Sequence, residues 1–209
     1  MQLLVPLTIF VAFELCLSAI VDHSDDFYWR DYNGDVPKDA LPGGMNREHK
    51  PTYIGQAVSQ GVLVPGEIIG GVKKMYYFGD YSGRIETENI KIFCTKHPEN
   101  FEWAKTNVKD VKLISKLRLI PGGFSHSEVV YIGRGIAENM LSVGKVVIPN
   151  DSRTPYFKVC VNGNGYSTSE FDVLCYRFRN PDNSSDDSTK IYSNVLLVTV
   201  TMFILKFVT

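Results

Sequence analysis

Several glycine, lysine and histidine residues occur in fragments of catalytic motifs, but none of these motifs is complete. Gly133-Arg134-Gly135 lacks the third glycine of a dinucleotide-binding turn. Gly144-Lys145 is followed by Val146, where a phosphate-binding loop needs Ser or Thr to hold Mg²⁺. The four histidines lie beside no Gly-x-Ser-x-Gly nucleophile motif. The sequence therefore predicts a protein that is not an enzyme and that uses no cofactor.

The cysteines lack the spacing of a metal site and are expected to have structural roles. No Cys-x-x-Cys pair or zinc-type Cys/His spacing occurs, so metal binding is not expected. Cys16 lies in an N-terminal apolar run, which leaves Cys94, Cys160 and Cys175. We expect Cys160 and Cys175 to form a disulfide across a hairpin. A Cys94–Cys175 bridge and a free thiol are the alternatives, because connectivity does not follow from sequence.

A short phrase occurs twice and indicates an internal duplication. Tyr53-Ile54-Gly55-Gln56 and Tyr131-Ile132-Gly133-Arg134 lie 78 residues apart, and each is followed by a second glycine eleven residues after its own, Gly66 and Gly144. Self-similarity at a fixed period is the signature of a repeat architecture. The flanking segments correspond in the same order: Pro42-Gly43-Gly44 with Pro121-Gly122-Gly123, and Ile92-Phe93-Cys94 with Val173-Leu174-Cys175.

Short β-branched and aromatic runs, bounded by glycine and proline, predict an all-β fold. The segment from Glu99 to Leu119 is the exception, because its composition allows a turn of helix or a strand at Val111 to Ile114. We expect this segment to join the two repeats. The runs expected as strands are Tyr53–Val58, Glu67–Ile69 and Ile90–Phe93 in the first copy, and Val129–Gly133, Lys145–Ile148 and Phe171–Leu174 in the second.

The N-terminal end of the chain is apolar and is interpreted as a signal peptide. Residues 1–19 carry one charge, Glu14, and end in the small residues Ser18 and Ala19. A buried first strand and an N-terminal membrane anchor are the alternatives. The signal peptide predicts entry into the secretory pathway, with the mature protein secreted or held on the extracellular face of the plasma membrane.

The C-terminal end is typical of a glycosylphosphatidylinositol attachment signal. Residues 183–209 contain small residues, a polar spacer and a terminal apolar tail. Asn183 or Ser184 is the expected attachment residue. A short membrane segment is the alternative, although the tail is shorter than the ~20 residues of a spanning helix. Residues 20–182 then form one domain, with repeat one at about 27–98 and repeat two at about 103–178.

Two further features bear on partners. The chain has 22 Lys and Arg against 23 Asp and Glu, a net charge of −1, which predicts no nucleic-acid partner and no strongly basic membrane-binding face. Asn150-Asp151-Ser152 and Asn183-Ser184-Ser185 are sequons, so Asn150 and Asn183 are expected sites of N-glycosylation. The sequence leaves open whether the domain forms a homodimer.

The first copy contains an ordered set of motifs: Trp29, Asn33-Gly34, Val36-Pro37, Ala40, Gly43-Gly44, Tyr53-Ile54-Gly55, Leu63-Val64-Pro65-Gly66 and Ile90 to Cys94. This pattern resembles the DM-nine repeat family. The second copy keeps most of the pattern but has Val143 where the family has a proline. The resemblance implies a compact β domain of two intertwined repeats related by a pseudo-twofold axis.

The resemblance also implies a recognition function. Members of the family include mannose-binding lectins of invertebrate immunity and modules of natterin-like toxins. The lectins hold the sugar with an acid just after Gly-Gly and with the lysine of Pro-Gly-Lys. Asn46 and Ser125 stand at the two acid positions here, and Glu67 and Lys145 stand at the two lysine positions.

Three functions are compatible with this partial match. The resemblance implies a carbohydrate-binding protein for mannose-type glycans that acts in innate immune recognition. A non-glycan protein-interaction or structural surface module is the first alternative. A protein of the kind labelled farnesoic acid O-methyltransferase is a remote one, since the chain lacks a fingerprint for a methyl-donor nucleotide.

Overall fold

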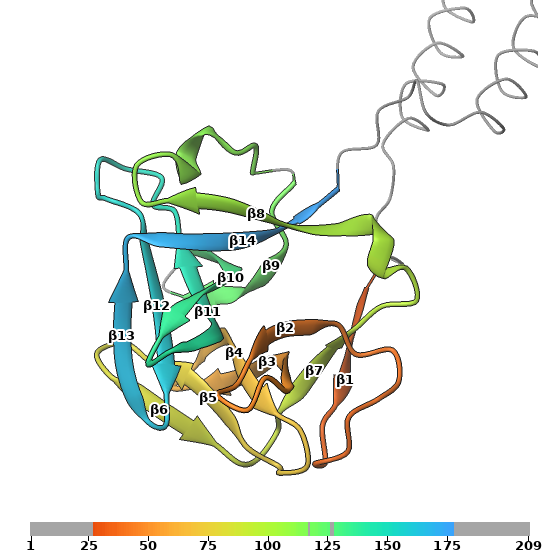
Figure 1. Cartoon of the computed structure of the whole chain (residues 1–209). Coiled ribbons are helices and arrows are strands. Elements are labelled where there is room, and N and C mark those ends of the chain that lie inside the picture. Colours follow the sequence, from red (N-terminus) through yellow and green to blue (C-terminus); the bar gives the residue numbers. More distant parts are fainter. Residues whose placement is uncertain (1–26, 117, 126–127, 178–209) are drawn as a thin grey trace, which may run out of the picture. The chain divides into compact units, whose positions relative to one another are not determined.

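The computed structural model describes residues 27–116, 118–125 and 128–177 (Figure 1). The expected signal peptide at 1–19 and the expected attachment residues Asn183 and Ser184 lie outside these described residues. Within them, no helix has both the length and the apolar character needed to cross a membrane. All the described strands belong to a single unit that ends at Tyr176.

Among the described residues, each repeat contains seven strands. Repeat one contains β1 (Tyr28–Asp31), β2 (Pro42–Met45), β3 (Pro51–Ser59), β4 (Val62–Ile69), β5 (Met75–Phe78), β6 (Gly83–Glu86) and β7 (Lys91–Cys94). Repeat two contains β8 (Phe101–Asn107), β9 (Pro121–Ser125), β10 (Glu128–Ala137), β11 (Met140–Val147), β12 (Tyr156–Val161), β13 (Asn164–Thr168) and β14 (Glu170–Tyr176). Two 3₁₀ turns, η1 (Pro98–Asn100) and η2 (Val111–Leu113), complete the described elements.

The strands pair in the same way in both repeats, and every pairing is antiparallel. The hairpin β3–β4 corresponds to β10–β11, and the outer pair β1–β7 corresponds to β8–β14. Figure 1 shows β8 and β14 side by side. The pairings β3–β7 and β10–β14 also correspond. The predicted all-β fold of two repeats with pseudo-twofold symmetry is therefore confirmed.

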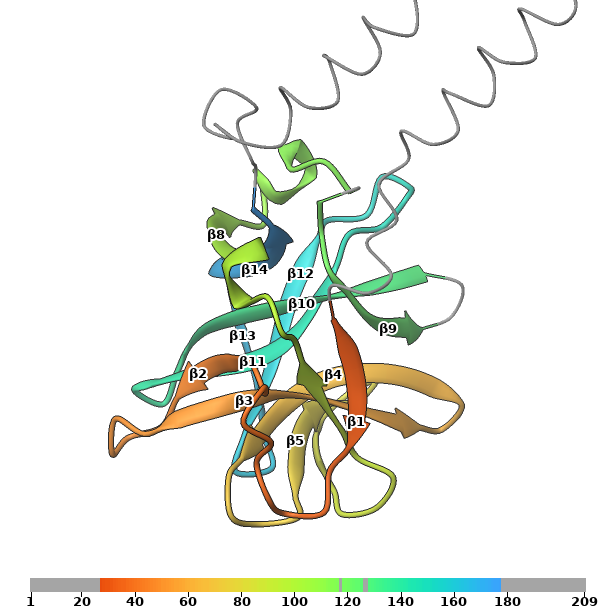
Figure 2. The same cartoon turned by 90° about the vertical axis from the view of Figure 1, so that its right-hand side faces the viewer.

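The repeats are intertwined because each one gives a strand edge to the other. β2 of repeat one pairs with β11 of repeat two, where Met45 lies opposite Leu141. In the equivalent pairing, β9 of repeat two meets β4 of repeat one, with Phe124 opposite Leu63. Figure 2 shows the long hairpins of the two repeats one above the other, joined by these contacts.

Two glycines allow this close approach. A Cβ atom on Gly44 would lie 2.1 Å from the backbone oxygen of Leu141, and one on Gly123 would lie 2.0 Å from the backbone oxygen of Leu63. Such a separation is far below van der Waals contact, so no larger residue fits without moving a strand. The second glycine of each Gly-Gly pair is thus required by contact with the other repeat.

A shared core lies between the two repeats. It contains Ile54 and Ile132 from the two Tyr-Ile-Gly phrases, together with Phe93 and Leu174 from β7 and β14, all fully buried. Each repeat also has a core cluster of its own. Because apolar side chains of both repeats fill the shared core, burial of this surface depends on their association.

The segment 99–119 is only partly as expected. The strand considered at Val111–Ile114 is wrong, and the alternative helical turn is found there. This turn, η2, covers Val111–Leu113 and buries Val111. A strand does occur earlier, as β8 at Phe101–Asn107, and it belongs to repeat two by pairing with β14. The connection between the repeats is therefore short and runs through η1.

The glycine contacts give a first prediction. Gly44→Ala and Gly123→Ala should each lower the free energy of unfolding by more than about 3 kcal/mol, because the new methyl group would overlap a backbone oxygen of the other repeat. Denaturant titration followed by tryptophan fluorescence measures this.

Gly61→Ala is the matched control. Gly61 lies in the β3–β4 turn with φ of +80°, and a Cβ there would meet nothing within 4 Å. Its cost should be about 1 kcal/mol, from the backbone conformation alone. Equal losses for all three variants would contradict the steric explanation.

Candidate functional site

Glu67, one of the four expected sugar ligands, is buried between the repeats. Its side chain is 2% exposed. Thr52 Oγ1 donates to Glu67 Oε1 over 2.8 Å, and the Val143 backbone N–H donates to the same oxygen over 3.4 Å. Burial raises the pKa of Glu67 to about 7, although these hydrogen bonds oppose the shift. The carboxyl group therefore links the two repeats.

Lys145, the equivalent residue of repeat two, is also buried and reaches into the other repeat. It is 4% exposed, and its Nζ donates to the backbone oxygen of Gly79 over 2.7 Å. The ammonium group lies 5.5 Å from the centre of the Phe78 ring. Burial lowers the pKa of Lys145, while the charge of Asp80 raises it.

Asn46 and Ser125 lie nearer the surface, just after β2 and at the end of β9, and both are half-buried. Asn46 Oδ1 accepts from the backbone N–H groups of Glu48 and Lys50, over 3.0 and 2.9 Å, so its side chain caps a turn. Of the four expected residues, two are thus buried and two are half-buried. Direct sugar contact by Glu67 and Lys145 does not fit their burial.

Cys94, Cys160 and Cys175 are free thiols, so the expected Cys160–Cys175 disulfide is not formed, nor is the Cys94–Cys175 alternative. The reason is their placement. Cys160 Sγ faces the Arg84 backbone oxygen, whereas Cys175 lies on β14 in the core of repeat two. Burial raises the pKa of all three thiols, to about 11 for Cys94 and Cys175. Burial therefore favours the protonated thiol over the reactive thiolate at each position.

The surface offers a groove over repeat two, with a volume of about 360 Å³ and a lining of both apolar and charged residues. Arg134 is central to it. Its Nε donates to Asp172 Oδ2 over 2.9 Å, and its guanidinium stacks 4.4 Å from the Trp103 ring centre. Lys105, Glu170 and the exposed Ile136 also line the groove. Its walls thus provide charged donors, charged acceptors and an apolar surface.

Arg134 and its counterpart Gln56 make equivalent contacts across the repeat boundary. Arg134 Nη1 lies 3.5 Å from the backbone oxygen of Gly43, and Gln56 Nε2 donates to the backbone oxygen of Gly122 over 2.8 Å. Each side chain therefore reaches the first glycine of the other repeat's Gly-Gly pair. Register places Lys91 beside Gln56 and Asp172 beside Arg134. The neighbouring strand therefore offers a positive charge in repeat one and a negative charge in repeat two.

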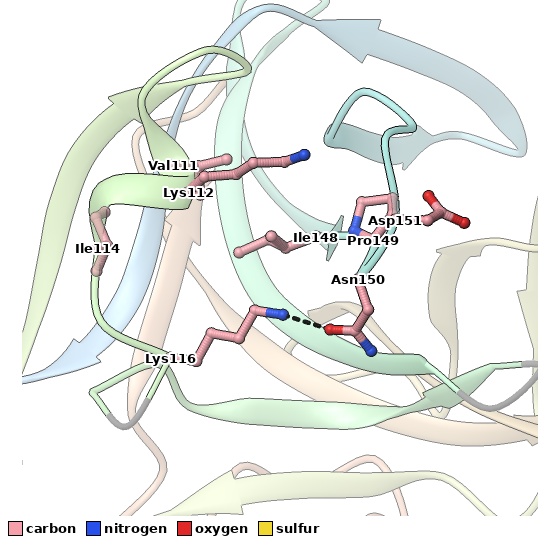
Figure 3. Close-up of a pocket in the computed structure, with 8 residues that line it drawn as sticks. All are labelled: Val111, Lys112, Ile114, Lys116, Ile148, Pro149, Asn150 and Asp151. Carbon is pink, nitrogen blue, oxygen red and sulfur yellow. Dashed lines mark hydrogen bonds between the residues drawn. The ribbon is translucent and has the colours of Figure 1, made fainter.

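A second cavity, of about 270 Å³, lies between η2 and the turn after β11 (Figure 3). Lys112 and Lys116 come from the first side, and Pro149, Asn150 and Asp151 from the second. Asn150 is exposed, and its Oδ1 accepts from Lys116 Nζ over 2.7 Å. Its N-glycosylation stays a prediction.

Sequence reasoning missed both cavities. The overall charge of −1 concealed a local basic run, Lys105, Lys109, Lys112, Lys116 and Arg118, with Asp110 as its one acid. A charge window along the chain would have detected it. Arg134 belongs to a repeated phrase, but its pairing with Asp172 depends on strand register. In the described ranges, no three His, Cys, Asp or Glu residues gather as a metal site.

Comparison with known proteins supports the family resemblance. Residues 12–83 match the family model described as the DM9 repeat. The match covers the part of repeat one up to the start of β6. Repeat two is recognised by the strand pairings that it shares with repeat one. No curated protein matches the chain.

A solved structure is also similar, the crystal structure of the nematode sperm cell motility protein MFP2B. The two share 14% sequence identity at a TM-score of 0.52. The likeness covers 74% of this chain and 46% of that one, so this chain corresponds to less than half of MFP2B. At this identity the likeness concerns the fold, a β domain.

The burial of Glu67 predicts a pH dependence of stability. Its folded-state pKa of about 7 lies above the ordinary 4.5, so the folded protein holds this proton more tightly. The stabilisation is fully present below about pH 4.5 and is lost as the pH rises to about 7. The loss is on the order of 3 kcal/mol. In Glu67→Gln this component should vanish, as measured by denaturant unfolding between pH 4.5 and 8.

Glu88→Gln is the control, because Glu88 is exposed. That variant should follow the wild-type pH profile. If Glu67→Gln also follows the wild-type pH profile, the Glu67 carboxyl group does not hold a proton in the folded state, and the prediction is wrong.

Burial of Lys145 makes it important for stability. Lys145→Ala should lower the free energy of unfolding by about 2–4 kcal/mol, because it removes a buried chain and leaves the Gly79 carbonyl without its donor. Lys158→Ala is the matched control, since Lys158 Nζ lies 5.3 Å from the same Phe78 ring but its side chain is half-buried. Its cost should be below about 1 kcal/mol. Equal costs, compared by urea titration, would contradict the structural importance of Lys145.

Proposed function

We propose that the protein is a non-enzymatic recognition module that binds carbohydrate in the groove around Arg134. The groove carries this proposal because it combines a guanidinium, carboxylates and an ammonium with an apolar wall. Sugar hydroxyls both donate and accept hydrogen bonds, and paired charged groups can satisfy both. The aliphatic face of a sugar ring can pack on Ile136 and Leu141.

The size and rigidity of the groove suit a small sugar. A volume of about 360 Å³ lies at the lower end of the range for small-ligand pockets, roughly 300–1,000 Å³. Arg134 is held by Asp172 and Trp103 before any ligand arrives. Fixed donors lose little conformational entropy on binding, which favours affinity. Mannose-type glycans remain the expected ligands from the family resemblance.

The proposal includes a location at the cell surface. The apolar residues 1–19 support secretion, and the small, polar and apolar segments of residues 183–209 support a lipid anchor at Asn183 or Ser184. Free thiols do not argue against this location, because all three are buried. A tethered recognition module would act where glycans of other cells or microbes are presented, as innate immune recognition requires.

The test replaces Arg134 by the residue of the other repeat, Arg134→Gln. Binding of mannose oligosaccharides, measured by glycan array and then by calorimetry, should weaken about tenfold or more, because a hydrogen bond to a charged group contributes about 1.5–3 kcal/mol. Glu170→Gln and Lys105→Ala, both exposed, should weaken binding without affecting the fold.

Arg84→Gln controls for loss of an exposed arginine elsewhere and should bind as the wild type does. Melting temperatures of all variants separate loss of the site from loss of the fold. Unchanged binding by folded Arg134→Gln, Glu170→Gln and Lys105→Ala would refute the groove as the sugar site. A wild type that binds no glycan on the array would refute the carbohydrate function.

A protein-interaction function is the second candidate, favoured by two equivalent exposed apolar surfaces. One consists of Met45, Ile136 and Leu141, and the other of Val58, Leu63 and Phe124. Ile136 and Val58 are each 62% exposed, which is unusual for such residues on a strand. If a protein partner is the true ligand, soluble sugars should fail to displace it.

A further inference from the structure

The cavity between η2 and the turn after β11 has features that the sugar groove does not use. Figure 3 shows Lys112 and Lys116 reaching from the η2 side, with Ile148 between them. Pro149, Asn150 and Asp151 form the opposite side. The cavity is therefore bounded by two cations on one wall and by a polar turn on the other.

The two lysines retain donor capacity for a ligand. Lys112 Nζ donates to the backbone oxygen of Arg153 over 3.3 Å, and Lys116 Nζ donates to Asn150 Oδ1 over 2.7 Å. Both acceptors are neutral. Neither lysine forms an ion pair with any residue that the structure describes. Because an ammonium group has three N–H donors, each lysine can still bind an anion.

The nearby acids are occupied by an arginine. Arg153 Nε lies 2.9 and 3.0 Å from the two oxygens of Asp151, and its backbone N–H donates to the same carboxylate. Arg153 also pairs with Glu128. In Figure 3 the Asp151 carboxylate points away from both lysines. The charged residues that line the cavity are therefore two lysines and one carboxylate, which leaves a net positive charge there.

The floor of the cavity is apolar. Val111, Ile148 and Pro149 are buried residues that line it. A charged pair of lysines over an apolar floor suits a ligand with both an anionic group and a carbon skeleton. A fully hydrated inorganic ion would gain nothing from these apolar contacts.

We propose that this cavity binds an acidic sugar through its carboxylate or sulfate group. Lys112 and Lys116 hold the oxyanion, the Asn150 amide donates to a neighbouring oxygen through Nδ2, and Ile148 and Pro149 contact the sugar ring. The site is independent of the Arg134 groove, because the two cavities have no lining residue in common.

The sequon gives this site a means of control. Asn150 both lines the cavity and begins Asn150-Asp151-Ser152. An N-linked glycan attaches at Nδ2, the atom that donates to the ligand, and would cover the cavity. The form without a glycan at Asn150 is therefore the binding form. Ser152→Ala removes the sequon and keeps Asn150.

The experiment uses the full chain with Ser152→Ala and measures binding of glucuronate, glucose 6-sulfate, glucose and inorganic sulfate by calorimetry at low salt. Both acidic sugars should bind, and glucose should bind at least tenfold more weakly. Adding Lys112→Gln and Lys116→Gln should weaken acidic-sugar binding at least tenfold. Adding Arg134→Gln should leave that binding unchanged, which separates this site from the groove.

The matched control adds Lys73→Gln and Lys74→Gln, which change the same charge on exposed lysines before β5. These should leave binding unchanged. An equal loss in both double-lysine variants would mean attraction by overall charge and would overturn the site. Inorganic sulfate binding as tightly as glucose 6-sulfate would overturn the assignment to a sugar. Equal binding by glucose and glucuronate would overturn the role of the oxyanion.

Discussion

The close approach of strands across the repeat boundary is the constraint on which the fold depends. β2 reaches β11 over Gly44, and β9 reaches β4 over Gly123, so the backbone of each repeat completes the sheet of the other. An open strand edge exposes backbone N–H and C=O groups, and each repeat covers part of an edge of the other at these two pairings. The shared core around Ile54 and Ile132 depends on the same contacts. The two sequence copies therefore form one domain with a shared core rather than two separate domains.

This arrangement also explains why two charged residues are buried at equivalent places. Glu67 lies opposite Ile54 in the β3–β4 register, and Lys145 lies opposite Ile132 in β10–β11. Residues directly opposite each other share a face of the sheet, so both side chains enter the boundary between the repeats. A buried charge needs partners, and each finds them in the other repeat: Val143 for Glu67 and Gly79 for Lys145. The apolar core favours association of the repeats, and these polar contacts make that association specific.

The sequence predicted the repeat, the strand content and the family, because glycine phrases and β-branched runs are local signals. The resemblance implied that the repeats are intertwined, but the sequence did not predict which strands pair across the boundary, since the partner of β11 is a matter of long-range register. Burial of Glu67 and Lys145 was missed for the same reason, and their residue types favoured the surface. The disulfide was wrong because sequence spacing placed Cys160 and Cys175 in one hairpin, whereas the chain sends them to different strands, β12 and β14, that do not pair.

A symmetric scaffold does not make the two halves chemically alike. Across β10, β14 and β8 the side chains run Arg134, Asp172, Lys105. Across the equivalent β3, β7 and β1 they run Gln56, Lys91, Asp31, with the charges reversed and the arginine replaced by a neutral amide. Cross-strand charge pairs stabilise both repeats in either order. The sign of the outward field, by contrast, decides which ligands each surface attracts. The charge order of the two repeats can therefore differ without loss of stability. Such a difference can give one repeat a binding surface while the other repeat maintains the fold.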